Sequence, residues 1–225
     1  MNYRFLYLSF FCFFAMTIYP AYSKPDYACP KRIASIPQDA LNQQVSVILQ
    51  TIYKKLDCET TFIPLPGKRG ILEFNMGQVD GEVFRLKVVE KLYTKPFAKS
   101  ASPLYHLNSS YWINPNSKNS AIGYSLGIVW QENYMKNQRG ISFRDNLVMF
   151  HAYNNGRIKG FLASDKTVRT FIKKGVFKIP PVQKENLLSA PIHHYLKAEF
   201  NDFMAVFSAY VEEHKPFKAL NLSSN

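Results

Sequence analysis

Segments with a helical spacing of apolar residues alternate, in the N-terminal part of the chain, with short runs of apolar, β-favouring residues. After one such run, Pro37-Gln38-Asp39 precedes a segment whose apolar positions recur every three or four residues up to Leu56. The pattern predicts a strand over 31–36, a helix over 37–56, a strand over 59–65, a helix over 68–76 and a strand over 79–84. Short strands that alternate with helices indicate parallel pairing, with helices covering the sheet.

The same alternation resumes after an aromatic, β-favouring segment over 103–113 and a polar segment over 114–119. It predicts a strand over 120–125, helices over 129–136 and 144–153, a strand after Gly156, and a helix capped by Ser164 or Asp165 that ends at Lys173. Pro180-Pro181 is a stiff connection that would carry the chain back toward the first set of elements. Residues 192–213 place apolar side chains on one side of a helix, which predicts a long C-terminal amphipathic helix.

One pentapeptide pattern occurs in both sets of elements. Gly77-Gln-Val-Asp-Gly81 and Gly156-Arg-Ile-Lys-Gly160 each follow an amphipathic segment and precede apolar residues. A glycine directly after a helix supplies a left-handed cap, so each copy predicts a corner between a helix and a buried strand. The repetition predicts two similar lobes, with residues 24–110 and 188–225 in the first and residues 111–187 in the second.

The N-terminus has the features of a signal peptide. Arg4 precedes an apolar run up to Ile18, and Ala21-Tyr22-Ser23 is a small-x-small cleavage site. About 14 apolar residues are fewer than the ~20 that span a bilayer, which disfavours the alternative of an uncleaved membrane anchor. We therefore expect residues 1–23 to be removed and the mature chain to reach the periplasm.

Two cysteines, Cys29 and Cys58, remain after the leader. An exported chain enters an oxidising compartment, where pairing of two cysteines is the default. In the chain-entropy model a bridge of this span stabilises by about 3–4 kcal/mol. Two free buried thiols and metal ligation are the alternatives, although two cysteines without a nearby histidine pair make a poor zinc site.

Basic residues outnumber acidic ones by 28 to 16, which gives a formal net charge of +12. Removing Arg4 with the leader lowers the charge by one, to about +11. Such a surface attracts anions, yet the lysines are scattered and no basic run interleaved with aromatic residues predicts a nucleic-acid module. A solvated basic face, or attraction to an anionic membrane surface, is the expected consequence.

The five histidines do not form a catalytic or metal-binding pattern. His193 and His194 are adjacent, so their side chains diverge, and the other three lie in separate predicted elements. No pair has the i, i+4 spacing of a metal site, and no serine or cysteine nucleophile motif accompanies them. The sequence predicts no metal, no cofactor and a protein that is not an enzyme.

Several segments, taken in order, resemble the periplasmic solute-binding proteins of the amino-acid-binding type, which have the type 2 periplasmic-binding-protein fold. The resemblance rests on Pro64-Leu-Pro-Gly-Lys-Arg69, Gly77-x-Val-Asp-Gly-Glu82 with Arg85, Gly156-Arg-Ile158 and Pro191-Ile-His-His-Tyr-Leu196. It implies an α/β fold of two lobes, each a mostly parallel sheet flanked by helices. It also implies two crossing segments, near 107–113 and 182–192, and a ligand that hinge closure encloses in the cleft.

On this interpretation, ligand-binding candidates come from both lobes. Arg85 ends the third predicted strand, where a guanidinium could grip a carboxylate, and Glu82 shares its face and would orient it. The alternative is a surface arginine paired with Glu82 or Glu90. Arg69 would point either to the cleft or to solvent. The remaining candidates are two aromatic residues near the crossing and two residues of the second lobe, namely Tyr105, Tyr111, Trp130 and Asp165.

The sequence also departs from the amino-acid-binding pattern. Members of the family often have Ser or Thr after a helix-opening glycine, and here Gly127-Ile-Val-Trp130 has no hydroxyl. The arginine motif of the first lobe has no match over 88–96, and Asp165 has a helix cap as its alternative role. The resemblance therefore does not assign an amino acid as the ligand.

Together these features predict a monomeric periplasmic binding protein that captures a small polar solute for the membrane permease of an ABC-type transporter. An amino-acid-like molecule is one candidate for that solute. The alternatives are an exported sensory or signalling module with a sensor partner, a divergent enzyme on the same scaffold, and a paralogue whose cleft has collapsed.

Overall fold

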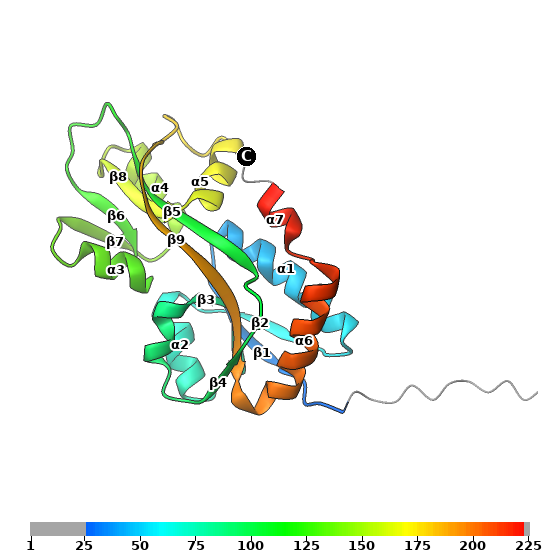
Figure 1. Cartoon of the computed structure of the whole chain (residues 1–225). Coiled ribbons are helices and arrows are strands. Elements are labelled where there is room, and N and C mark those ends of the chain that lie inside the picture. Colours follow the sequence, from blue (N-terminus) through cyan, green and yellow to red (C-terminus); the bar gives the residue numbers. More distant parts are fainter. Residues whose placement is uncertain (1–25, 223–225) are drawn as a thin grey trace, which may run out of the picture.

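A mixed sheet of nine strands, flanked by helices, runs through the computed structural model, which describes residues 26–222 (Figure 1). The strand order is β2-β1-β3-β9-β5-β8-β6-β7, and β4 also pairs with β9. The strands are β1 (Arg32–Ser35), β2 (Thr61–Pro64), β3 (Gly81–Leu86), β4 (Phe97–Lys99), β5 (Tyr105–Ile113), β6 (Ile122–Ser125), β7 (Gly140–Phe143), β8 (Gly160–Ser164) and β9 (Val182–Lys197). The α-helices are α1 (Ala40–Lys55), α2 (Gly67–Asn75), α3 (Val129–Met135), α4 (Asn146–Asn154), α5 (Asp165–Lys173), α6 (Asn201–His214) and α7 (Lys218–Leu222). This architecture confirms the predicted α/β fold class.

Two parallel groups of strands are joined by two long antiparallel strands. β1 pairs in parallel with β2 and β3, and β6 pairs in parallel with β7 and β8. Between them, β5 and β9 pair from Tyr105 opposite Ile192 to Ile113 opposite Val182. We call the β1–β3 side, with α1, α2 and α6, the first half, and the β6–β8 side, with α3, α4 and α5, the second half (Figure 1). The segments expected to cross between lobes, near 107–113 and 182–192, lie in these two paired strands.

Each half contains its own apolar core. In the first half, α1 and α6 bury Leu49 and Phe207 completely against the sheet. In the second half, the ring of Phe150 lies 4.9 Å from that of Phe161 and 4.8 Å from that of Phe177, measured between centroids. Burying a side chain of this size stabilises by roughly 1.5–3 kcal/mol relative to exposure.

The predicted boundaries of the lobes fall within β5 and β9, which the two halves share.

Helix starts follow the predicted capping residues. The carboxylate of Asp39 accepts the backbone N–H of Asn42 at 2.7 Å and caps α1. Of the two candidate caps for α5, the hydroxyl of Ser164 has that role, because it accepts the backbone N–H of Thr167 at 3.3 Å. These caps fix where each helix leaves the carboxyl end of its preceding strand.

The doubled corner is confirmed. Gly77 and Gly156, which follow α2 and α4, have φ angles of 74° and 69°, in the left-handed region that glycine adopts without strain. Val79 and Ile158 then enter the core with exposed fractions of 1% and 0%. Each corner leads into a strand, β3 or β8, that lies beside the central pair β5 and β9.

The helix predicted over 192–213 is wrong in its first part. Residues Val182–Lys197 form β9, and the helix begins only at Asn201. Leu196 and Phe203 have the spacing of one helix face. Leu196 is instead a buried residue of β9, which has strand partners on both edges. Those partners are distant in sequence, so local periodicity does not reveal them. The sequence pattern also does not predict the short strands β4 and β7.

A disulfide joins Cys29 and Cys58, whose Cα atoms are 5.3 Å apart, and confirms the predicted pairing. It ties the segment before β1 to the turn between α1 and β2. The predicted signal peptide over 1–23 lies outside the described residues. Among residues 26–222, no helix combines the length and the apolar character needed to cross a membrane.

His194 is fully buried between the first-half helices and β3. Its Nδ1 lies 2.8 Å from the carbonyl oxygen of Glu82, and its Nε2 lies 2.7 Å from the hydroxyl of Tyr53. Because a carbonyl only accepts, Nδ1 carries the proton and Nε2 accepts the hydroxyl of Tyr53. This arrangement holds a neutral imidazole, and burial lowers the pKa of His194 to about 4.

Acidification from pH 6.5 to pH 4 is therefore expected to lower the free energy of unfolding by about 3 kcal/mol through His194. The unfolded chain binds a proton on this imidazole near pH 6.5, whereas the folded chain does so only near pH 4, so protonation favours unfolding over that interval. Urea unfolding at a series of pH values measures the slope. His194→Gln should flatten it, while His106→Gln, at an exposed position, should not; equal slopes in all three proteins would contradict the assignment.

Candidate functional site

A pocket lies where the two halves face each other, at the carboxyl ends of their parallel strands. The ends of β3, β6 and β8 line it through Leu86, Ser125 and Ser164, and Ile36 lines it directly after β1. Parallel α/β sheets bind ligands in this crevice, because the connections that leave the strand ends vary freely while the strands hold them in place. The topology alone thus nominates this pocket as a binding site.

Most side chains that line the pocket are apolar. The apolar residues are Ile36, Pro37, Leu41, Pro66, Phe84, Leu86, Val88, Val89, Leu107, Leu126, Ile128, Val129, Trp130 and Ala163. The polar ones are Asp39, Arg85, Ser109, Ser125, Gln131, Arg144, Asp145, Asn146 and Ser164. The cavity has a volume of about 100 Å³, and the pocket is partly open to solvent.

The halves touch each other at one side of the pocket through two glycines. A Cβ atom on Gly67, at the start of α2, would lie 2.7 Å from the Cα of Gly127, which precedes α3. Directly beside this contact, the ammonium of Lys68 forms a 2.5 Å ion pair with Glu132 of the second half. Only glycines permit this approach of two backbones, so the two halves are in direct contact beside the pocket.

A second contact between the halves lies at the start of α4. The side-chain amide of Asn146 donates to the carbonyl oxygen of Gln38 at 3.2 Å, and its Oδ1 accepts the hydroxyl of Ser125 at 3.1 Å. Burial raises the pKa of the neighbouring Asp39, although hydrogen bonds from the backbone N–H groups of Asn42 and Leu41 act in the opposite direction. Polar groups at this side of the pocket therefore bond to one another.

Arg85 belongs to a buried network at the wall of the pocket. Its Nη2 donates to Glu82 Oε1 at 2.5 Å and to the carbonyl oxygen of Gly67 at 2.9 Å. The other carboxylate oxygen of Glu82 accepts the hydroxyl of Tyr93. Burial lowers the pKa of Arg85, but the carboxylate of Glu82 outweighs this effect and the pKa is raised overall, so Arg85 stays charged.

One N–H group of Arg85 is both buried and unpaired. Its Nε is buried and has no hydrogen-bond partner among the described residues. A buried, unpaired N–H of a charged group costs about 1–3 kcal/mol or more. Gly70 lets the network lie this close to α2, because a Cβ there would approach Glu82 Oε1 to 2.6 Å.

The structure brings only some of the predicted site residues together. Arg85 and Trp130 line the pocket from opposite halves, and Glu82 lies behind Arg85. Arg69 is exposed on α2 and pairs with Glu73 at 2.9 Å. The other three predicted residues are not part of the lining: Tyr105 lies in the first core, Tyr111 packs beside Met135, and Asp165 begins α5.

Sequence reasoning does not predict several residues that shape the pocket. Gly67 and Gly127 form the contact between the halves, and Gln131 accepts the backbone N–H of Ser125 at 2.7 Å through its side chain. Asp39 is visible in the sequence only as a helix cap. The available signal is topological, because each of these residues follows the carboxyl end of a parallel strand.

Within residues 26–222, no group of three or more His, Cys, Asp and Glu side chains is arranged to hold a metal ion. The adjacent histidines have separate partners: His193 Nδ1 lies 2.9 Å from the carbonyl oxygen of Ser100, whereas His194 belongs to the buried network with Tyr53.

Solved structures of amino-acid-binding proteins share this fold. A mutant of ArgBP from T. maritima has 14% sequence identity and a TM-score of 0.67, over 87% of this chain and 92% of that one. An ancestral arginine-binding protein bound to arginine has 14% identity and a TM-score of 0.67, over 83% and 92%. The amino acid ABC transporter substrate-binding protein AbpA from Streptococcus pneumoniae, bound to L-arginine, has 13% identity and a TM-score of 0.66, over 86% and 93%. No family model and no curated protein sequence matches the chain.

Proposed function

We propose that this protein is a periplasmic solute-binding protein that passes its ligand to the membrane permease of an ABC-type transporter. The observation that carries the proposal is the pocket between the two halves, at the carboxyl ends of parallel strands from both. A pocket built from two halves encloses a small ligand only when both contact it, which couples binding to closure. The arginine-bound proteins with the same fold and the disulfide, which suits an oxidising compartment, support the proposal.

On this proposal the two halves are the lobes, residues 24–110 with 188–225 and residues 111–187, and they move as units in a monomer. In the described sheet, β9 pairs with the first parallel group through β3, and β5 pairs with the second through β8, so bending of this joined pair of strands would open the cleft. The contact of Gly67 with Gly127 and the ion pair of Lys68 with Glu132 are the interactions that opening would break.

The solute that suits this pocket combines one polar group with an apolar body. The guanidinium of Arg85, which lines the pocket, would donate to an acceptor such as a carboxylate or carbonyl oxygen. Around it, Phe84, Leu107 and Trp130 offer apolar contact.

A thermal-shift screen with the twenty L-amino acids and short monocarboxylates tests this function. A solute present at about 100 times its Kd stabilises by roughly 2.7 kcal/mol, which corresponds to about 5–10 °C for a chain of this size. Arg85→Lys keeps a cation beside Glu82 but removes the Nε donor, so it should lose most of the shift, while Arg69→Lys should keep it. If no solute raises the midpoint, or if Arg85→Lys responds like the wild type, this site does not hold the polar group.

Gly127→Ala is expected to hold the cleft open. The added Cβ would lie 2.7 Å from the backbone nitrogen of Lys68 and 3.0 Å from the Cα of Gly67, a clash that exists only in the closed form. Overpacking of this kind costs about 1–3 kcal/mol, so the apparent affinity for a solute should fall about tenfold or more. Small-angle X-ray scattering should show a larger radius of gyration.

Gly156→Ala is the matched control, because Gly156 has a similar positive φ of 69° and a Cβ there meets no atom within 4 Å. Both variants carry the same backbone strain, and only one obstructs closure. Equal scattering curves and equal solute affinities for the two variants would show that the glycine contact does not govern closure.

A further inference from the structure

The far end of the second half is a basic surface. Four connections emerge there, on the side of β6, β7 and β8 opposite to the pocket: residues 114–121, 136–139, 155–159 and 174–181. None of these connections contains an acidic residue. We call the following six residues on or directly beside three of these connections the basic cap: Lys118, Arg157, Lys159, Lys173, Lys174 and Lys178. All of them are exposed except Lys159, which is half-buried.

The charge of the protein is concentrated in this half. Residues 111–187 contain 12 basic and 4 acidic residues, a net charge of 12 − 4 = +8. Two of the four acidic residues form ion pairs near the pocket, Glu132 with Lys68 at 2.5 Å and Asp145 with Arg144 at 3.3 Å. The other two, Asp165 and Glu185, lie outside the four connections, so basic residues are in excess at the cap and its potential is positive.

Hydrogen bonds hold the connections of the cap in one arrangement. The amide of Asn119 donates to the carbonyl oxygens of Gly156 and Arg157 at 3.2 and 2.8 Å. The amide of Asn154 donates to the carbonyl oxygen of Val176 at 2.8 Å, and its Oδ1 accepts the backbone N–H of Lys178 at 3.0 Å. Lysines on a fixed frame lose less conformational freedom when they meet a surface than lysines on a loose loop.

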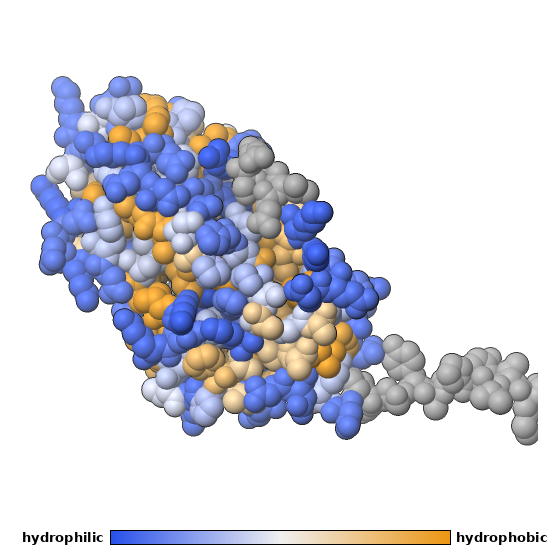
Figure 2. Space-filling view, viewed as in Figure 1, coloured by the Kyte–Doolittle hydropathy of each residue, from blue (hydrophilic) through white to orange (hydrophobic). Residues whose placement is uncertain are grey.

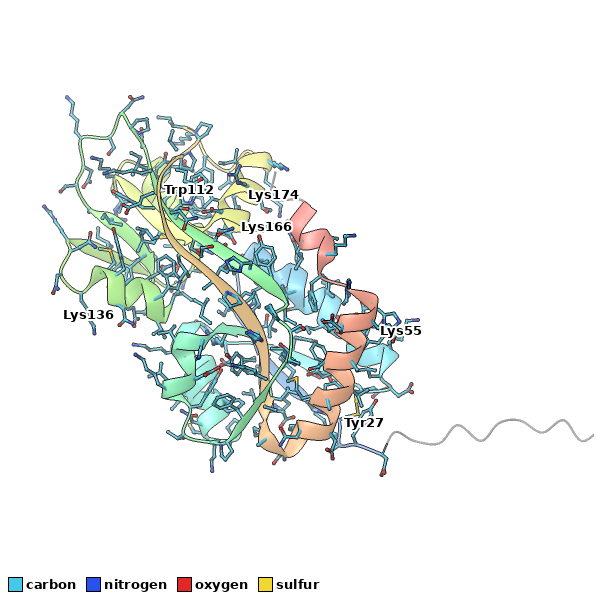
Figure 3. All side chains as sticks on the ribbon, viewed as in Figure 1. Tyr27, Lys55, Trp112, Lys136, Lys166 and Lys174 are labelled. Carbon is cyan, nitrogen blue, oxygen red and sulfur yellow. A yellow bond between two sulfur atoms is a disulfide. The ribbon has the colours of Figure 1, made fainter. Side chains whose placement is uncertain are left out.

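Apolar side chains stand among these lysines. Ile179 and Val182 are 46% and 52% exposed, on either side of Pro180-Pro181 and between Lys178 and Lys184. Figure 2 shows the corresponding end of the molecule, at the upper left, as mostly hydrophilic with hydrophobic residues between, and Figure 3 labels Lys174 at the end of α5. Basic residues around exposed apolar ones are the combination that binds at the interface of an anionic bilayer.

We infer that the basic cap is a docking surface for an anionic lipid bilayer. The lysines and Arg157 would meet lipid phosphates, and Ile179 and Val182 would enter the region between head groups and acyl chains. The pocket lies at the other end of the second half, so the solute site stays open to solvent while the cap is bound. Docking would keep the protein at the surface of the membrane that holds its proposed permease.

Sedimentation with vesicles tests this surface. The purified protein should bind vesicles of equal parts phosphatidylglycerol and phosphatidylcholine, should be released by salt, and should not bind pure phosphatidylcholine. Lys118→Gln with Lys173→Gln and Lys178→Gln should lower the partition coefficient on the order of 100-fold, since each basic residue near an anionic surface contributes about fivefold.

The matched control removes three exposed lysines from the first half: Lys54→Gln with Lys55→Gln and Lys215→Gln, which lowers the net charge equally. This variant should bind within about threefold of the wild type, because the lost charges lie away from the cap. Equal losses in the two triple variants, or no binding of the wild type to anionic vesicles, would overturn the assignment.

Ile179→Asn with Val182→Asn distinguishes a bilayer from an acidic protein. A bilayer site should lose part of its binding, about tenfold, when these apolar side chains are removed. If the double variant binds vesicles like the wild type, and soluble polyglutamate displaces the wild type from vesicles at equal charge concentration, the cap fits an acidic protein and the bilayer is the wrong partner.

Discussion

Arg85→Met is expected to lower the free energy of unfolding by about 3–5 kcal/mol. The variant leaves Glu82, whose side chain is 1% exposed, without the guanidinium that lies 2.5 Å from its Oε1. Removing one partner of a buried ion pair leaves an uncompensated charge in the protein interior, and this cost greatly exceeds the loss of the attraction itself. Urea unfolding followed by circular dichroism measures the change.

Arg69→Met is the matched control, because Arg69 also pairs with a glutamate but is 64% exposed. Its i, i+4 pair with Glu73 should contribute no more than about 0.5 kcal/mol. Adding Glu82→Gln to Arg85→Met should recover a large part of the lost stability. If Arg85→Met and Arg69→Met both lowered the free energy of unfolding by a similar small amount, Arg85 would not be needed to compensate the buried charge of Glu82.

This buried pair also changes how the arginine serves the proposed site. Two of its hydrogen bonds are already made within the protein, to Glu82 and to Gly67, and its charge is balanced before a ligand arrives. The network fixes the guanidinium at the wall of the pocket, which favours a ligand group that accepts a well-placed hydrogen bond.

Removing the disulfide by Cys29→Ser with Cys58→Ser is expected to lower the free energy of unfolding by about 3–4 kcal/mol. The bridge closes a loop with a sequence separation of 29, and its loss restores freedom to the unfolded chain. The folded state changes less, because Cys58 lies at the edge of the first core while Cys29 is half-buried beside it. Urea unfolding with and without dithiothreitol measures the effect.

Dithiothreitol should destabilise the wild type by the same amount and leave the double serine variant unchanged. The His194 slope between pH 6.5 and pH 4 should persist in the double variant, since His194 and the bridge do not touch. If complete reduction left the free energy of unfolding of the wild type unchanged, the bridge would not constrain the unfolded chain.

Local signals in the sequence predict the elements well wherever neighbouring residues decide the structure. Asp39 and Ser164 cap their helices, and Gly77 and Gly156 turn the chain from helix to strand, because each acts on backbone groups within a few residues. These signals were sufficient for the α/β class and for two similar sets of elements.

Structure that depends on distant partners is not visible in the same way. The end of β9, residues 192–197, is predicted as helix because Leu196 and Phe203 have helical spacing, whereas pairing with β3, β4 and β5 makes it a strand buried on both faces near Leu196. The same reason limits the site. Arg85 is predictable from its position at a strand end, but the approach of Gly67 to Gly127 requires two halves that come together only in the fold.

The central claim is that the two halves close over a shared pocket. The most direct test is the distance between them, measured by pulsed electron paramagnetic resonance on spin labels at the exposed positions Leu72 and Lys136. Leu72 lies on α2 and Lys136 follows α3, so the pair spans the proposed cleft. Addition of the pooled L-amino acids and monocarboxylates should shift the distances to the short value of the closed form, and the shift should be absent in Gly127→Ala. An unchanged distribution in the presence of a solute that raises the melting midpoint would contradict closure of two halves over a shared pocket.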